Sequence, residues 1–175
     1  KSLVRTALVT GGNRGLGRET VRQLAQKGLK VVASYRDAAH LPALQTELPG
    51  VTWICADLSD AAGVETLIKA LRESDTAIDV LVNNAGVFLD YDADPTGSVW
   101  TASRDTITAT FNTNTLAPFQ LCQALVPGML ERGFGRVVNL SSGMGQLDEM
   151  EGGTPAYRIS KTALNAVTKI FAAEV

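Results

Sequence analysis

The chain has 175 residues, of which 45% are hydrophobic and 19% charged, and its formal net charge is −2 at pH 7. This length fits one domain, and the hydrophobic fraction argues against intrinsic disorder. There is no basic stripe for nucleic acid, no apolar run approaching the ~20 residues that span a bilayer, and no signal-peptide pattern at the N-terminus. We therefore expect a cytoplasmic protein with neither nucleic-acid nor membrane partners.

Short apolar segments alternate along the chain with segments of helical periodicity. The sequence predicts strands at residues 5–10, 29–34, 51–55, 78–82 and 137–140. It predicts helices at 16–27, 40–48, 61–74, 101–114, 115–132 and from 155 to 175, with loops at 86–98 and 143–153. Because strands and helices alternate and the strands are apolar on both faces, we expect an α/β fold. The expected architecture is a doubly wound parallel sheet, the Rossmann fold, in a single domain over 1–175.

A glycine-rich turn follows the first predicted strand, with the sequence Thr10-Gly11-Gly12-Asn13-Arg14-Gly15-Leu16-Gly17. Glycines at such a turn let the backbone approach a pyrophosphate, whose charge is met by the N-terminus of the next helix. The turn ends a strand and opens a helix, which is the context that a dinucleotide-binding motif requires. We therefore predict a dinucleotide site here, with an ordinary strand-to-helix turn as the alternative.

The glycine spacing, TGxxxGxG, resembles that of the short-chain dehydrogenase/reductase family. Further motifs of the family follow in the same order: Asp57 after the third strand, Asn83-Asn84-Ala85-Gly86 after the fourth, Ser141-Ser142 after the fifth, and Tyr157 with Lys161 on the last helix. The resemblance covers residues 5–175 and favours the NADP-dependent carbonyl-reductase-like branch. It implies a Rossmann domain that carries its own catalytic residues.

Two basic residues indicate which dinucleotide is bound. An NAD site usually has a carboxylate at the end of the second strand, whereas this chain has Tyr35 followed by Arg36, and Arg14 lies within the glycine turn. Guanidinium groups bind phosphate with charge-assisted hydrogen bonds, so we predict NADP(H). Asp37 is the conflicting observation, because a carboxylate that points inward would repel the 2′-phosphate.

The resemblance also implies a set of cofactor contacts. Asp57 would accept a hydrogen bond from the adenine amino group, and Leu58 would flank the adenine ring. Asn83 would stabilise the sheet edge near the adenine ribose. The full predicted cofactor set is Gly11, Asn13, Arg14, Gly15, Leu16, Gly17, Arg36, Asp57, Leu58, Asn83, Ala85, Gly86, Tyr157 and Lys161.

Tyr157 and Lys161 are four residues apart and so share one face of the last helix. Thr154 is a candidate N-cap, with Pro155 at the favoured first position. The pKa of a free tyrosine is about 10, and a nearby ammonium group lowers it by stabilising the phenolate. This pair is therefore suited to acid–base catalysis near neutral pH.

The resemblance completes the predicted catalytic set as Asn114, Ser142, Tyr157 and Lys161. Ser142 would hydrogen-bond the substrate oxygen, with Ser141 as a neighbouring packing or turn residue. The backbone carbonyl of Asn114 would hold a water linked to Lys161, and Asn112 is the competing candidate. Pro118 accounts for a local disturbance of that helix, since proline removes a backbone hydrogen bond.

These residues predict an oxidoreductase that transfers a hydride between NADP(H) and a small carbonyl or alcohol, with Tyr157 as the general acid/base. The alternative is a non-catalytic NADP-binding sensor or regulator on the same fold, and a third interpretation is a fragment that serves only in assembly. We expect no metal. The residues left outside the site are His40 as a solvated side chain, Trp53 as core, Trp100 as either pocket border or helix packing, and Cys55 and Cys122 as buried, reduced thiols.

Two expectations concern the molecule as a whole. Relatives in this family commonly pair through the two long helices, here 115–132 and 155–175, and the last helix is more apolar than one sheet-facing stripe needs; we therefore expect a homo-dimer or homo-tetramer. The chain stops near the end of the helix that carries Tyr157, where relatives continue into further strands and a substrate loop. We therefore expect a truncated chain, with the fifth strand left as an exposed edge.

Overall fold

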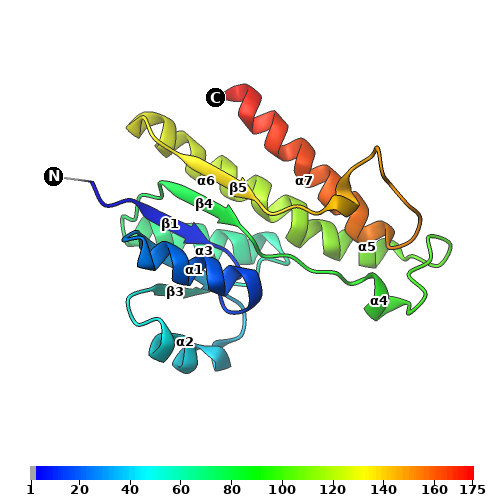
Figure 1. Cartoon of the computed structure of the whole chain (residues 1–175), viewed down its shortest axis with the longest axis horizontal. Coiled ribbons are helices and arrows are strands. Elements are labelled where there is room, and N and C mark those ends of the chain that lie inside the picture. The colour runs from blue at the N-terminus through cyan, green and yellow to red at the C-terminus, as the bar shows by residue number, and fades with distance from the viewer. Residues whose placement is uncertain (1–2) are drawn as a thin grey trace.

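The strands of the computed structural model, which describes residues 3–175, pair in the order β3-β2-β1-β4-β5, and all the pairings are parallel. Helices cover both faces of this sheet (Figure 1). The doubly wound Rossmann fold expected from the sequence is thus confirmed. The strands are β1 Thr6–Val9, β2 Lys30–Tyr35, β3 Thr52–Cys55, β4 Val80–Asn83 and β5 Arg136–Asn139.

The helices agree with the predicted segments to within a few residues, apart from two differences described below. They are α1 Gly15–Gln26, α2 Leu41–Glu47, α3 Ala61–Glu73, α4 Asp90–Ala93, α5 Arg104–Phe111, α6 Ala117–Arg132 and α7 Pro155–Glu174. Three further helical segments are the 3₁₀ turns η1 Ala38–His40 and η3 Gly143–Gly145, and the π-helix η2 Asn112–Leu116.

Two hydrophobic clusters hold the layers together, one on each face of the sheet. Leu8 of β1 packs in the cluster that contains the buried faces of α3 and α6, whereas its neighbour Val9 packs with Val21 of α1. Successive residues of a strand point to opposite faces, so a strand covered on both sides must be apolar throughout. This is why the strand segments of the sequence lack an alternating polar pattern.

The strand order reverses between β1 and β4, since β2 lies on one side of β1 and β4 on the other. In open α/β sheets a crevice for ligands forms outside the carboxyl ends of the strands at such a switch point. The glycine turn follows β1 and the Asn83–Gly86 segment follows β4. The topology therefore brings these two motifs to the same end of the sheet.

Two predicted boundaries were wrong. The segment 86–98, expected to be a loop, contains the short helix α4. The helices expected at 101–114 and 115–132 form one helical stretch from α5 to α6, interrupted only by the π-helix η2. The local disturbance expected near Pro118 is therefore an extra residue in a helical turn and not a break.

The exposure of five side chains tests further expectations from the sequence. Cys122 is buried as predicted, but Cys55 lies on the edge strand β3 and is exposed; both are free thiols. Trp100 is 92% exposed and so packs on neither the pocket nor a helix. Val137 and Val138 on β5 are partly exposed, as expected for a strand at the edge of the sheet. No helix within residues 3–175 has the length and apolar character to cross a membrane.

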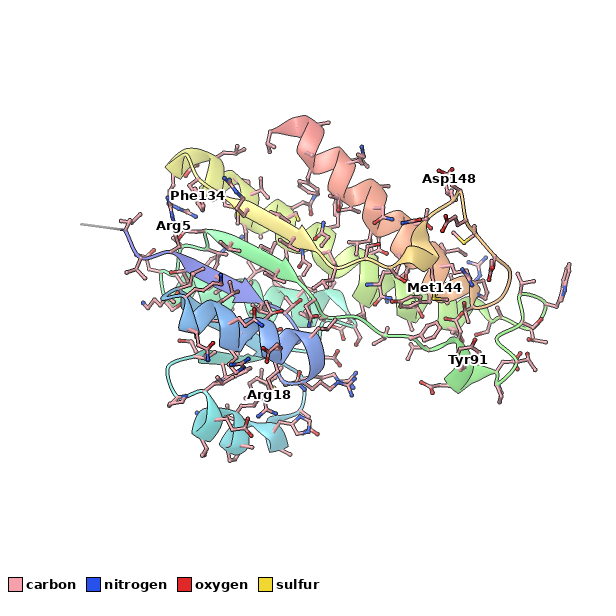
Figure 2. All side chains as sticks on the ribbon, viewed as in Figure 1. Arg5, Arg18, Tyr91, Phe134, Met144 and Asp148 are labelled. Carbon is pink, nitrogen blue, oxygen red and sulfur yellow. The ribbon has the colours of Figure 1, made fainter. Side chains whose placement is uncertain are left out.

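The two ends of the sheet differ in the side chains that gather there (Figure 2). At one end, Arg5 lies over the ring of Phe134, with the guanidinium carbon 3.6 Å from the ring centre. At the other end, Tyr91 and the loop that carries Met144 and Asp148 lie near the start of α7. The predicted catalytic residues therefore belong to the end of the molecule where the longest loops gather.

Candidate active site and cofactor cleft

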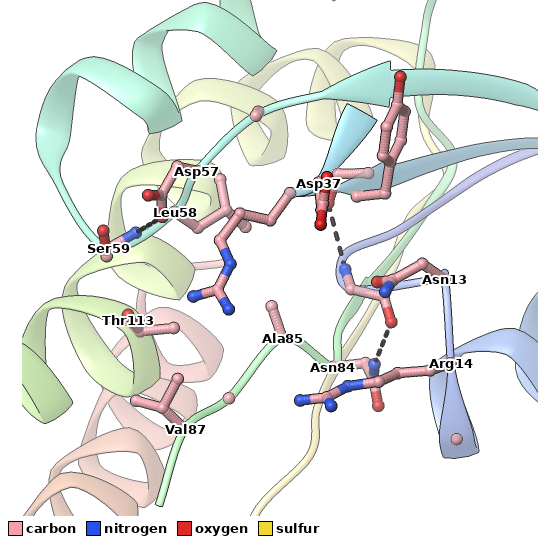
Figure 3. A pocket seen from close by; sticks show the side chains of 18 of the residues that line it. Asn13, Arg14, Asp37, Asp57, Leu58, Ser59, Asn84, Ala85, Val87 and Thr113 are labelled. Atoms are coloured by element: carbon pink, nitrogen blue, oxygen red, sulfur yellow. Dashed lines mark hydrogen bonds between the residues drawn. The ribbon is translucent and has the colours of Figure 1, made fainter. Parts of the chain in front are cut away.

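A cavity of about 450 Å³ lies outside the carboxyl ends of the central strands (Figure 3). It brings together these predicted cofactor residues: Gly11, Asn13, Arg14, Gly15, Leu16, Gly17, Arg36, Asp57, Leu58, Ala85 and Gly86. Sequence reasoning did not assign the remaining lining residues to the cofactor: Ser34, Tyr35, Asp37, His40, Ala56, Ser59, Asn84, Val87 and Thr113. A volume in this range is typical of small-molecule sites.

The glycine turn depends on glycine at two positions for different reasons. Gly15 has φ +56°, a left-handed conformation that glycine adopts without steric cost, and it opens α1. A Cβ at Gly17 would lie 2.3 Å from the Gly11 carbonyl oxygen, so a larger residue would push the turn apart. The backbone of this turn consequently lies close to the N-terminus of α1, where backbone N–H groups favour an anion.

Two polar side chains outside the turn hold it in place. The Asn84 side-chain amide donates to the carbonyls of Thr10 and Gly11, at 3.0 and 3.1 Å. The Gly11 N–H donates to the Ser34 hydroxyl at 3.1 Å. Asn84 directly follows β4 and Ser34 lies in β2, so their proximity to the turn depends on the strand order; this is why both were missed as supporting residues.

The charges around the cavity are mixed. Arg14 and Asp57 approach it from opposite sides (Figure 3). The Ser59 backbone N–H, 3.0 Å from Asp57 Oδ1, the Ser59 hydroxyl and, more weakly, the Arg36 guanidinium hold the pKa of Asp57 below its ordinary value. Asp37 also borders the cavity, but its carboxylate accepts the Ala39 N–H at 3.0 Å and caps η1.

Asn83 lies outside the residues that border the cavity. It is buried, and its amide donates to Asn139 Oδ1 at 2.8 Å, which links β4 to β5. Tyr157 and Lys161 also lie outside the lining, on α7. Gly86, which lines the cavity, is nevertheless close to Lys161, because a Cβ at Gly86 would lie 3.6 Å from Lys161 Nζ.

Lys161 is 6% exposed, and its Nζ donates to the Leu140 carbonyl at 2.8 Å. The same nitrogen lies 5.7 Å from the centre of the Tyr157 ring. Burial lowers the pKa of Lys161 because it penalises the charged ammonium. The Tyr157 ring packs on Phe88, with 4.4 Å between ring centres. One face of α7 thus presents the phenol and the ammonium together.

Asn114 is 1% exposed within the π-helix η2. Its side chain exchanges two hydrogen bonds with the backbone of Val87, at 2.8 and 2.9 Å, and donates to Ser160 Oγ at 3.0 Å. Its backbone carbonyl would normally accept from residue 118, but Pro118 has no N–H. The carbonyl of Asn112, the competing candidate, accepts the Ala117 N–H.

Ser142 begins the turn η3, and its hydroxyl accepts the Met144 N–H at 3.1 Å. The neighbouring Ser141 is exposed. The turn packs on α7, where the Thr162 hydroxyl donates to the Gly145 carbonyl at 2.9 Å. Ser142 therefore lies on a segment anchored to the helix that carries Tyr157.

The model of the family described as short chain dehydrogenase matches residues 5–175 of this chain. The chain belongs to the short-chain dehydrogenase family. Its sequence is 35% identical over 175 residues to Carbonyl reductase [NADPH] 2 of Sus scrofa, covering 97% of this chain and 65% of that protein. It is 37% identical over 172 residues to L-xylulose reductase of Mesocricetus auratus, covering 98% and 66%.

A solved short-chain dehydrogenase structure agrees with the fold throughout. A metagenomic short-chain oxidoreductase in complex with NADP superposes with a TM-score of 0.85 at 31% identity, covering 99% of this chain and 78% of that one. The chain spans about two-thirds of the length of the curated relatives named above. The family membership predicted from the motifs is thus confirmed.

One site feature of this short-chain dehydrogenase differs from the sequence expectation. Thr154 precedes α7, but its hydroxyl makes no capping hydrogen bond and has no partner among residues 3–175. Asp90 of α4 accepts the N–H groups of Ala156 and Tyr157 instead, at 2.8 and 3.1 Å. Thr154 is thus the N-cap residue of α7 with Pro155 at the first position, as predicted, but the capping hydrogen bonds come from the buried Asp90 carboxylate, 66 residues before Ala156.

Proposed function

We propose that this protein is an oxidoreductase that transfers a hydride between NADP(H) and a carbonyl or alcohol substrate, with Tyr157 as the general acid/base. The observation that carries the proposal is the Tyr157–Lys161 pair, which lies beside Gly86 at the end of a glycine-lined cavity. The names of the relatives support it, since the Sus scrofa and Mesocricetus auratus proteins are both reductases.

The residues around the cavity fit a dinucleotide phosphate. The N-terminus of α1 and the glycine turn suit a pyrophosphate, Asp57 and Leu58 suit an adenine, and the segment from Ala85 leads to Lys161. NADP(H), when bound, supplies or accepts the hydride. The cofactor set proposed for this chain is the set predicted from the sequence, with Asn83 acting from the sheet edge and not from the lining.

Arg14 and Arg36 favour NADP(H) over NAD(H), because both border the cavity and can pair with a 2′-phosphate. The conflict that Asp37 posed is reduced, since its carboxylate is engaged by the Ala39 N–H. The NADPH in the name of the Sus scrofa relative and the NADP in the metagenomic structure support the same choice.

The positions of the side chains support the following catalytic roles. In the direction of carbonyl reduction, Tyr157 donates a proton to the oxygen, and the Ser142 hydroxyl donates a hydrogen bond to the same atom. Lys161 stabilises the phenolate that remains, since its ammonium lies on the same helix face. The Asn114 carbonyl holds a water that returns a proton towards Lys161, which accounts for a proline four residues later.

The alternative is a cofactor-binding module that performs no chemistry. An assay of NADPH oxidation against a panel of small ketones, aldehydes and quinones separates the two. We expect turnover on at least one compound and a lower activity with NADH. Saturable NADPH binding with no turnover on any compound would favour the module.

The substrate is a small carbonyl or alcohol, and its identity depends on the loop around Met144. We propose a homo-dimer or homo-tetramer formed through α6 and α7, because Leu130 and Ile170 are more than half exposed on these helices. Location in the cytoplasm stays a prediction from the sequence.

A further inference from the structure

The first turn of α7 has a complete set of hydrogen bonds, and Asp90 supplies two of them. A helix leaves its first N–H groups without partners inside the helix. Here the Thr154 N–H donates to the Gly97 carbonyl at 2.7 Å, Pro155 has no N–H, and the Arg158 N–H donates back to Thr154 at 3.1 Å. The two that remain, on Ala156 and Tyr157, both donate to the carboxylate of Asp90.

Asp90 is suited to this position by its burial. The residue is 5% exposed, and each of its two carboxylate oxygens accepts one of these N–H groups. A negative charge at a helix N-terminus interacts favourably with the helix dipole. A buried carboxylate is stable only when it is hydrogen-bonded, so Asp90 and the helix start satisfy each other.

The residue before the helix would not hold its conformation alone. Thr154 has φ +43° and ψ +53°, a left-handed conformation that is strained for a β-branched residue. Such strain persists only where the surrounding structure fixes it. The contact with Gly97 on one side and the Asp90 carboxylate on the other provide that constraint.

We propose that Asp90 is a positioning residue for Tyr157, an inference that rests on the proposed function. Its carboxylate binds the backbone N–H of Tyr157 itself and fixes the helix turn from which the phenol projects. Phe88, two residues earlier, packs on the Tyr157 ring at 4.4 Å. The segment 88–90 therefore holds both the backbone and the side chain of Tyr157, whereas Lys161 is anchored independently through Leu140.

The test compares Asp90→Ala, Asp90→Asn and the matched control Asp92→Asn, an exposed aspartate on the same helix. In the full protein with NADPH and a carbonyl substrate, we expect the Ala variant to lose about 10-fold to 100-fold in kcat, the scale of a misplaced catalytic group. The Asn variant keeps one acceptor and should be intermediate. The NADPH dissociation constant should not change, because Asp90 lies outside the cavity lining, and Asp92→Asn should match the wild type.

Amide hydrogen exchange provides a readout that does not depend on turnover. We expect faster exchange at Ala156 and Tyr157 in both Asp90 variants and unchanged exchange in α1. Wild-type kcat in Asp90→Ala, or a loss of NADPH binding in proportion to the loss of kcat, would overturn the inference. If the Ala variant does not fold, the Asn variant decides by the same criteria. A wild-type protein that oxidises no NADPH would overturn the proposed function instead, and exchange at Tyr157 would still decide whether Asp90 holds the helix.

Discussion

The Lys161 ammonium is buried between the Tyr157 ring and the carbonyl of Leu140, a position that costs stability and suits the proposed role of Lys161. Burial penalises the charged form of Lys161. The ammonium is attracted to the Tyr157 oxygen only when the phenol has lost its proton. A residue selected for packing alone would be apolar here. The sequence spacing predicted that the two side chains share a helix face, but the burial of Lys161 depends on η3 and β5 and was not predictable from the spacing.

The lowered pKa of Lys161 leads to a pH dependence of stability. Because its folded-state pKa is below the ordinary value of 10.5, the unfolded chain binds more protons between the two values. The loss of stability caused by burying the charged Lys161 is therefore complete below the folded-state pKa, and it is relieved as pH rises towards 10.5. We expect the free energy of unfolding of the wild type, relative to Lys161→Met, to rise between neutral and alkaline pH in urea titrations.

The control for this measurement is Lys169→Met, on the exposed side of the same helix. The free energy of unfolding of the wild type relative to Lys169→Met should not rise between neutral and alkaline pH. A Lys161→Met difference that is constant with pH would contradict the burial argument.

Arg36 illustrates a second residue-scale prediction, the choice between cofactors. A hydrogen bond to a charged group contributes about 1.5–3 kcal/mol, so Arg36→Ala should weaken NADPH binding about 10-fold or more. NADH has no 2′-phosphate, and its dissociation constant should change little. Fluorescence titration with both nucleotides measures the two constants. Arg22→Ala, which removes an exposed arginine paired with Glu19 on α1, is the control. Equal weakening for both nucleotides would contradict the assignment.

At the scale of elements, the π-helix η2 lies where a catalytic backbone group is proposed. Pro118, two residues after η2, has no N–H to donate to the Asn114 carbonyl. Hydrophobic periodicity predicted the helices on either side of η2 but treated them as two separate helices. The pattern of apolar residues shifts where the extra residue is inserted. A π-helix is rare and is often found at functional sites, but only the structure distinguishes it from a helix end.

Pro118→Ala tests the element directly. Alanine restores the N–H that an α-helix directs to the Asn114 carbonyl, so we expect the turn to become regular and the carbonyl to be engaged. Turnover should fall by about 10-fold or more, within the range of proton-transfer contributions, with NADPH binding unchanged. Pro127→Ala is the matched control, since Pro127 is an exposed proline inside α6. Wild-type turnover in Pro118→Ala would remove the Asn114 carbonyl from the mechanism.

In the molecule as a whole, strand order determines which motifs meet. The sequence was most informative about this overall arrangement. The alternation of elements predicted the sheet, and the motifs after β1, β3 and β4 all border one cavity. Asp90 and Asn84 were not recognised because each acts on a segment more than 60 residues away. An aspartate in a loop and the second asparagine of a turn carry no local signal of such contacts.

The proposed assembly involves the exposed apolar side chains of α6 and α7. On α7, Leu164 and Val167 are buried and Phe171 packs on Phe119, whereas Ile170 is 55% exposed. We expect a dimer or tetramer in sedimentation at micromolar concentration. Ile170→Glu should shift the protein towards monomer, because a charge in an apolar interface is costly. Leu147→Glu introduces the same charge at an exposed leucine in the segment between η3 and α7, and it should leave the assembly unchanged. A monomeric wild type would contradict the proposed assembly.

In the proposed function Tyr157 is the general acid/base, and NADPH is held mainly by the residues that line the cavity, to which Tyr157 does not belong. The direct measurement is single-turnover NADPH oxidation by Tyr157→Phe, alongside the NADPH dissociation constant of the same variant and Tyr91→Phe as control. We predict that the oxidation rate falls by about 10²-fold to 10⁴-fold, whereas NADPH binding changes little and the control variant matches the wild type. Full turnover by Tyr157→Phe with NADPH bound would contradict the account.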